Sequence, residues 1–214
     1  MAGRDAPAPA RFTLLSRVLH WFMAVMVITQ LLIGVTMVAS LRHYPSLLAV
    51  HRPLGAAILA FAVIRLVNRL THRPPPFPAT MSRPERRIAT WSEYLLYGLV
   101  LAQPLVGWAM LSAARFPVVL YGPIHLPGVA PHNITLFAAL RLCHSVLALL
   151  LFLTFTAHMC AILFHTWVVR DRMIDRMALW PVKHAGPQSV RAAGDGRGQP
   201  SEGDDPLAAN QPPP

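Results

Sequence analysis

The sequence predicts an all-α membrane protein, a bundle of four transmembrane helices with both termini in the cytoplasm. Hydrophobic residues make up 54% of the 214 residues and charged residues only 13%, against roughly 25% charged in soluble domains. Four stretches are nearly free of charge over the ~20 residues needed to cross a bilayer. Basic residues gather at alternate ends of these stretches, which is typical of cytoplasmic loops. This pattern excludes a soluble enzyme and argues against nucleic-acid binding.

The first two apolar stretches predict the first two helices. Residues 18–41 contain no Asp, Glu, Lys or Arg, and predict a helix over about residues 15–40. A cleaved signal peptide is the alternative, but its apolar core is usually only about 7–15 residues long. Residues 43–64 carry a single charged residue, Arg52, near their start, and predict a helix over about residues 47–71.

Two further uncharged stretches predict the third and fourth helices. Residues 94–114 indicate a helix at about 90–113, and residues 142–169 indicate one at about 136–170. The uncharged span between them, 116–140, contains four prolines and two glycines. Such a backbone could not satisfy its own hydrogen bonds in lipid, so we expect most of it to form a structured external loop.

The positive charges give the orientation. Most of the 19 Lys and Arg residues lie in the N-terminal tail, in the connection between the second and third helices, and after the fourth helix. The positive-inside rule therefore places these segments in the cytoplasm. Residues 1–12 and 181–214 hold too little apolar surface to fold, so we expect disordered cytoplasmic tails around a membrane domain at 13–180.

Histidines inside the predicted helices are the candidate functional residues. An ionisable group in a membrane helix is costly and marks a candidate site. A lone helical histidine is more often a satisfied polar core residue, but here five occur on three helices. They are His20, His51, His144, His158 and His165. The direction of each helix places His51 and His144 near the external face, and His20 with a histidine of the fourth helix near the cytoplasmic face.

The spacing on the fourth helix predicts two haem groups. His144 and His158 are 14 residues apart, which places both rings on one helix face about 21 Å apart. Neutral imidazole is a good axial ligand for haem iron. We therefore expect an outer haem between His51 and His144 and an inner haem between His20 and His158. His165 fits the depth of His20 equally well, but would separate the two irons by about 31 Å. His165 then lies near the cytoplasmic interface, where it either exchanges protons with a quinone or extends to the headgroups.

Glycine and arginine positions are compatible with such a cofactor. Gly34 follows His20 by 14 residues, so it lies at the outer level, where it would let a flat macrocycle approach or simply help helices to pack. Haem propionates need cations, and guanidinium pairs well with carboxylate. The candidates are Arg17, Arg65 and Arg69 for the inner haem and Arg52 and Arg141 for the outer haem. The alternative is that each only contributes to the positive-inside bias or to interfacial anchoring.

Several motifs resemble the bacterial cytochrome b561 family. They are HRPLG at 51–55, RL at 65–66, PLVGW at 104–108, and the histidines at 144 and 158 followed by His165 ahead of Arg170. The resemblance covers about residues 10–180. It implies a four-helix cytochrome of the bacterial inner membrane with two haem b groups, which exchanges electrons with the quinone pool. The axial positions of the family fall on His20, His51, His144 and His158. At least one branch is similar to a superoxide oxidase that uses ubiquinone. Glu93 and Phe164 stand where many relatives have histidine.

We therefore expect electron transfer across the inner membrane between an external one-electron donor, with superoxide as one candidate, and the quinone pool. This would make the chain a superoxide:quinone oxidoreductase if superoxide is the donor. The alternative is a haem-bearing membrane subunit of a dehydrogenase or hydrogenase, partnered by an unidentified redox protein. A divalent-metal transporter is disfavoured, because transporters place carboxylates at mid-membrane and Glu93 is the sole acidic candidate, at a helix end.

Overall fold

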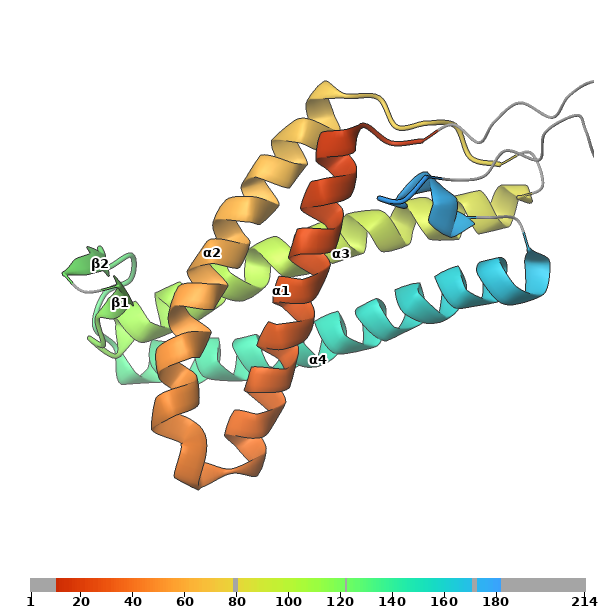
Figure 1. Cartoon of the computed structure of the whole chain (residues 1–214). Coiled ribbons are helices and arrows are strands. Elements are labelled where there is room, and N and C mark those ends of the chain that lie inside the picture. The colour runs from red at the N-terminus through yellow and green to blue at the C-terminus, as the bar shows by residue number, and fades with distance from the viewer. Residues whose placement is uncertain (1–10, 79–80, 122, 171–172, 182–214) are drawn as a thin grey trace, which may run out of the picture. The chain divides into compact units, whose positions relative to one another are not determined.

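Four long helices dominate the fold. The computed structural model describes residues 11–78, 81–121, 123–170 and 173–181. Its long helices are α1 (Leu14–Ala39), α2 (Tyr44–Thr71), α3 (Arg83–Ala113) and α4 (Ile134–Phe164) (Figure 1). A π-helical turn at His165–Val169 extends α4, and short 3-10 turns lie at Leu41–His43 and Met173–Arg176. All four are long and apolar enough to cross a membrane. The predicted fold class, an all-α protein with four candidate membrane spans, is thus confirmed.

Side-chain caps fix where three of the helices begin. Thr13 Oγ1 accepts a hydrogen bond from the backbone N–H of Ser16 at the start of α1. Asn133 Oδ1 accepts one from the N–H of Leu136 at the start of α4. Such caps satisfy N–H groups that have no partner within the helix.

The start of α3 differs from the prediction. Ser82 and Glu85 form a capping box, in which Glu85 Oε2 accepts the Ser82 N–H at 2.7 Å, and a proline lies in the first turn. The helix therefore begins at Arg83 and not near residue 90. The apolar stretch could not reveal this first part, because the additional turns lie outside the uncharged window and carry Arg86 and Arg87.

The outer surface of the bundle is apolar. A small cluster of buried side chains draws on all four helices: Met26, Val27, Ile58, Leu99 and Leu151. Many other large apolar side chains are exposed along the helices, among them Val25, Leu32 and Leu142, each more than 60% exposed. In water such a surface would drive association, whereas lipid tails solvate it without cost.

The helices form two hairpins. α1 packs against α2, α3 packs against α4, and the two hairpins meet through α2 and α3. We call the end where α1 and α3 begin the terminal end, and the opposite end the loop end. Proline interrupts the hydrogen bonding of α2 at Pro53 and of α3 at Pro104, because a proline has no N–H to donate.

A β-hairpin forms part of the connection between α3 and α4. β1 (Val118–Tyr121) pairs antiparallel with β2 (Ile124–Leu126), with a register irregularity after Val119. The loop that follows is fastened to α3: Trp108 Nε1 donates to the carbonyl of Pro127 at 2.9 Å. β1 also contacts α2. The proline-rich span between the third and fourth helices is therefore structured.

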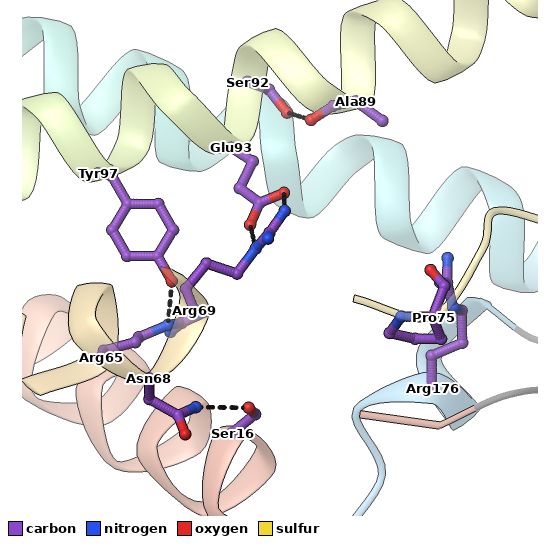
Figure 2. Close-up of polar contacts among 10 residues, drawn as sticks. All are labelled: Ser16, Arg65, Asn68, Arg69, Pro75, Ala89, Ser92, Glu93, Tyr97 and Arg176. Carbon is purple, nitrogen blue, oxygen red and sulfur yellow. Dashed lines mark hydrogen bonds and ion pairs between the residues drawn. The ribbon is translucent and has the colours of Figure 1, made fainter. Parts of the chain in front are cut away.

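A terminal clasp, which we define as Arg11–Phe12 together with Met173–Pro181, lies at the terminal end. Arg176 is buried and lies beside Pro75 (Figure 2). Its Nη2 donates to the carbonyls of Pro75 at 2.7 Å and Pro76 at 3.0 Å. Its guanidinium also lies over the rings of Phe12 and Phe77, 5.6 and 5.5 Å from their centroids. One arginine thus joins the N-terminal segment, the proline-rich connector and the segment after α4.

The clasp is also bound to α1. Arg17 Nη1 donates to the carbonyl of Ala178 at 2.7 Å, and Arg11 donates to the same carbonyl. Trp21 Nε1 donates to the carbonyl of Met177 at 2.8 Å. Arg11 and Phe12 were expected in a disordered tail, but these contacts hold them in place. The rest of the two expected tails, apart from Pro181, lies outside the described residues.

Candidate functional site

Two histidines from different hairpins meet near the loop end. The ring centroids of His51 on α2 and His144 on α4 are 6.3 Å apart, with the ring planes inclined by 72°. Both side chains are half-buried. The structure therefore brings together the two residues that the sequence placed at the outer level.

A second pair lies toward the terminal end. His20 on α1 is half-buried and within electrostatic reach of His158 on α4. The His20 ring packs edge-on against Trp21, with centroids 5.9 Å apart. Trp21 is in turn bonded to the terminal clasp. α4 thus contributes one histidine to each pair, 14 residues apart.

Three of the four paired histidines have a ring nitrogen that makes no hydrogen bond to a described residue. The Nδ1 atoms of His20, His51 and His144 are buried without a hydrogen-bond partner in the described part of the chain. A buried polar atom without a partner costs free energy and calls for an explanation. Neutral imidazole is the commonest metal ligand in proteins and binds through its unprotonated ring nitrogen, so a metal-containing group beside these rings would account for their lack of a protein partner.

The spacing of the outer pair suits one metal between two imidazoles. A bond from a first-row metal to imidazole is about 2 Å long, so two nitrogens on opposite sides lie about 4 Å apart and the ring centres roughly 6 Å apart. The centroids of His51 and His144 are separated by 6.3 Å. Among the described residues, α4 packs extensively against α3 but not against α1 or α2. The residues therefore fit a flat iron porphyrin held between helices.

Two glycines border the outer pair. A Cβ atom on Gly34 would lie 4.0 Å from His51 Cε1, an ordinary contact, so this predicted residue does lie beside the ring. A Cβ on Gly107 would lie only 3.1 Å from His144 Cε1 and 3.3 Å from its Nδ1. Gly107 therefore leaves room for the His144 ring, a role that sequence reasoning missed.

Polar contacts join α2 to α3 (Figure 2). Arg65 Nε donates to the hydroxyl of Tyr97 at 3.1 Å, and Arg69 Nε forms an ion pair with Glu93 Oε1 at 2.7 Å. Arg65 is within electrostatic reach of both His20 and His158. Of the three arginines expected at the inner site, Arg65 is therefore the best placed, since Arg69 already faces a carboxylate and Arg17 binds the clasp.

The other candidates occupy different surroundings. Arg52 is within electrostatic reach of His51, and its Nε is buried without a partner in the described residues. Arg141 is exposed on α4, one turn before His144. His165 opens the π-helical turn after α4, packs edge-on against Phe164 at 6.0 Å, and interacts electrostatically with Glu85.

Gln30 and Gln103 are the site neighbours that the sequence analysis did not single out. Gln30 Nε2 donates to the backbone carbonyl of His51, and Gln103 Nε2 donates to that of His144. The available signal was that α1 and α3 each contain one amide side chain inside an otherwise apolar stretch. No cluster of three or more His, Cys, Asp or Glu that could hold a metal ion occurs among the described residues.

Four helices that are apolar enough to cross a membrane, with histidine pairs between them, are compatible with a membrane cytochrome of the b type. The sequence model of the family described as prokaryotic cytochrome b561 matches residues 11–179, and the chain belongs to that family. The resemblance seen in the motifs is thus confirmed. The chain is a multi-pass membrane cytochrome with a role in electron transfer, and membership implies that it binds haem b.

Two relatives illustrate the similarity. The chain is 27% identical over 163 residues to a protein named probable superoxide oxidase CybB from Yersinia pestis, covering 74% of this chain and 90% of that protein. It is 28% identical over 123 residues to cytochrome b561 homolog 2 from Escherichia coli (strain K12), covering 56% of this chain and 65% of that protein.

Proposed function

We propose that this chain binds two haem b groups and carries electrons across the bacterial inner membrane, from an external one-electron donor to the quinone pool. The observation that supports it most strongly is the outer histidine pair: His51 and His144 converge to 6.3 Å from different hairpins, and each has a buried Nδ1 without a partner in the described residues. His20 and His158 would hold the inner haem in the same way.

Each site residue has a defined part in this proposal. The four imidazoles bind and orient the two groups, and Arg65 and Arg52 pair with propionates at the inner and outer site. When bound, haem supplies a one-electron iron couple whose potential depends on its axial ligands and their hydrogen bonds. The large apolar side chains exposed along the helices would face lipid and not water, so the histidines between the hairpins would lie in a medium of low dielectric constant.

In this proposal the terminal end of the bundle lies in the cytoplasm. Arginines concentrate in the connector between α2 and α3 and in the sequence that follows α4, and the positive-inside rule favours the cytoplasmic side for them. His165 then lies at the cytoplasmic interface, where it would exchange protons with ubiquinone bound nearby. The outer pair would face the periplasmic donor.

Superoxide is the donor we propose. The relative from Yersinia pestis is named as a probable superoxide oxidase, and Arg42 and Arg141 are exposed toward the loop end. Positive charges near a site attract a small anion and raise its rate of encounter, an effect that weakens with salt.

Stopped-flow spectroscopy with superoxide pulses tests this function on the purified haem-loaded protein. We expect rapid haem reduction, followed by reoxidation when ubiquinone is added. The double variant R42E/R141E should be reduced at least about tenfold more slowly at low salt. Reduction by dithionite is the control, because it should remain complete in the variant. An unchanged superoxide rate in the variant would refute guidance by these arginines, and no reduction of the wild type would refute superoxide as the donor.

A further inference from the structure

A glutamine on α1 binds the backbone of one outer histidine. Gln30 Nε2 donates to the carbonyl oxygen of His51 on α2 at 3.0 Å. Gly55, one helical turn beyond His51, makes space for the amide: a Cβ there would lie 3.2 Å from Gln30 Nε2, which is closer than an ordinary contact. The bond therefore ties α1 to α2 at the level of the histidine.

A glutamine on α3 makes the same contact with the other outer histidine. Gln103 Nε2 donates to the carbonyl oxygen of His144 on α4 at 3.1 Å and lies 3.3 Å from the ring nitrogen Nε2 of His144. Gly107, one turn beyond Gln103, leaves room for that ring. The backbone and the ring of His144 are thus both in contact with one amide group.

Neither glutamine is needed to complete a helix. A carbonyl inside a helix already accepts the N–H of the residue four positions later, so each glutamine uses the second lone pair of its histidine carbonyl. The amide oxygens of Gln30 and Gln103 are buried without a partner in the described part of the chain. A half-satisfied buried amide costs about 1–3 kcal/mol, so ordinary helix packing would be better served by an apolar residue.

The hairpin arrangement indicates what the two glutamines do. The rings of His51 and His144 meet between the hairpins, where α2 and α4 lack extensive packing against each other among the described residues. Direct packing of α2 on α4 therefore cannot set the position of the rings. Each histidine must be held from within its own hairpin, and the glutamine of the preceding helix is the group that binds it there.

We infer that Gln30 and Gln103 are positioning residues, which fix the height and rotation of His51 and His144 for axial ligation of the outer haem. The inference rests on the proposed haem function. Loss of either donor should let its histidine shift along or around the helix, and the orientation of the imidazole planes and the potential of the outer haem should change. The inner haem, ligated by His20 and His158, should be unaffected.

The test uses Q30M and Q103M, which keep side-chain length and remove the donor. The readouts are haem content, the electron paramagnetic resonance signal of each haem, and redox titration, with H51A and H20A used to assign outer and inner signals. We expect only the signal of the outer haem to shift. The redox equilibrium of that haem should change at least tenfold, which corresponds to a change of about 59 mV in midpoint potential for one electron. N68L is the matched control, because Asn68 is also an amide that ties α2 to α1, through Ser16, away from the outer pair.

A second variant avoids any loss of a hydrogen-bonding group. G55A presses a methyl group against Gln30 Nε2, while alanine favours the helix by up to about 1 kcal/mol over glycine. It should reproduce the shift of Q30M in a folded protein. The inference would be overturned if the signals of the outer haem were unchanged in Q30M, Q103M and G55A. It would also be overturned if N68L and the glutamine variants shifted the signals of both haems equally. A wild type without haem would instead refute the proposed function.

Discussion

At the scale of single residues, the contact between Gly107 and His144 is the tightest constraint on the site. His144 Cε1 would lie only 3.1 Å from a Cβ at position 107, so the ring occupies the space that any other residue would need. A glycine inside a helix normally costs about 0.5–1 kcal/mol relative to alanine. Gly107 therefore serves to accommodate the His144 ring and does not stabilise the helix.

Replacing Gly107 with alanine should separate the effect of this residue on helix stability from its effect on the His144 ring. We expect G107A to leave the helix at least as stable, while the His144 ring is displaced and the haem content falls by about half through loss of the outer group. Haem quantification per chain and thermal unfolding measure the two effects. G98A is the control, because nothing lies within 4 Å of a Cβ at Gly98. Full haem content in G107A would contradict this role.

The sequence predicted the histidines but not the residues that hold them. A histidine in an apolar stretch is conspicuous, and helix geometry gives its depth, so His51 and His144 could be matched across helices. Whether they bind haem stays a prediction. Gln30, Gln103 and Gly107 could not be assigned, because their partners depend on which helix faces meet, and helix periodicity does not contain that information.

At the scale of helices, the α2–α3 contact near the terminal end is held by polar groups inside apolar elements. Arg69 and Glu93 form an ion pair at 2.7 Å with side chains that are 25% and 33% exposed, and Arg65 donates to Tyr97 one turn away. Such partly buried charges are tolerated only when they are paired. This contact thus joins one hairpin to the other.

A double-mutant cycle measures how much the pair contributes. E93Q should lower the free energy of unfolding by about 1–2 kcal/mol, because the Arg69 guanidinium loses its carboxylate. R69M/E93Q should recover part of that loss, which gives a coupling free energy of roughly 1 kcal/mol. Unfolding in mixed detergent supplies the free energies. Purely additive effects of R69M and E93Q would show that the pair contributes nothing.

The existence of each helix was predictable, while its boundaries were less so. Uncharged stretches reveal the membrane-crossing part because lipid excludes charge. The first turns of α3 and the β-hairpin after it depend on local hydrogen bonds, such as the capping box of Ser82 and Glu85. Hydropathy carries no signal for those contacts, although the Ser-x-x-Glu pattern itself was present in the sequence.

At the scale of the membrane domain, the terminal clasp joins segments that are far apart in the sequence. Trp21, which directly follows His20, donates a hydrogen bond to the carbonyl of Met177. The ring centroids of Trp21 and Trp180 are 6.4 Å apart. The clasp therefore stabilises the end of α1 that carries His20. This arrangement was not predictable, because each of its segments is short and lies outside the apolar stretches.

Removal of one donor should loosen the clasp. W21F retains the ring packing and loses the Nε1 donor, at a cost of about 0.5–1.5 kcal/mol. We expect backbone amides in residues 173–181 to exchange with deuterium several-fold faster. W108F, which removes a comparable indole donor to Pro127 in the loop after β2, should leave that segment unchanged. Equal protection of residues 173–181 in W21F and the wild type would argue against the clasp.

The orientation of the domain is a separate prediction. With both termini in the cytoplasm, a fluorescent protein fused to the C-terminus should fluoresce and alkaline phosphatase fused there should be inactive. A phosphatase inserted next to Pro123, at the β1–β2 turn, should be active. The reverse pattern would place the outer histidine pair on the cytoplasmic side.

Haem quantification with reduced-minus-oxidised spectroscopy tests the central claim most directly. Wild-type protein should contain two haem b groups per chain, H51A and H144A should lose the same one, and H20A and H158A should lose the other. The double variant H51A/H158A should contain none. A colourless wild type, or a double variant that keeps both groups, would contradict the account.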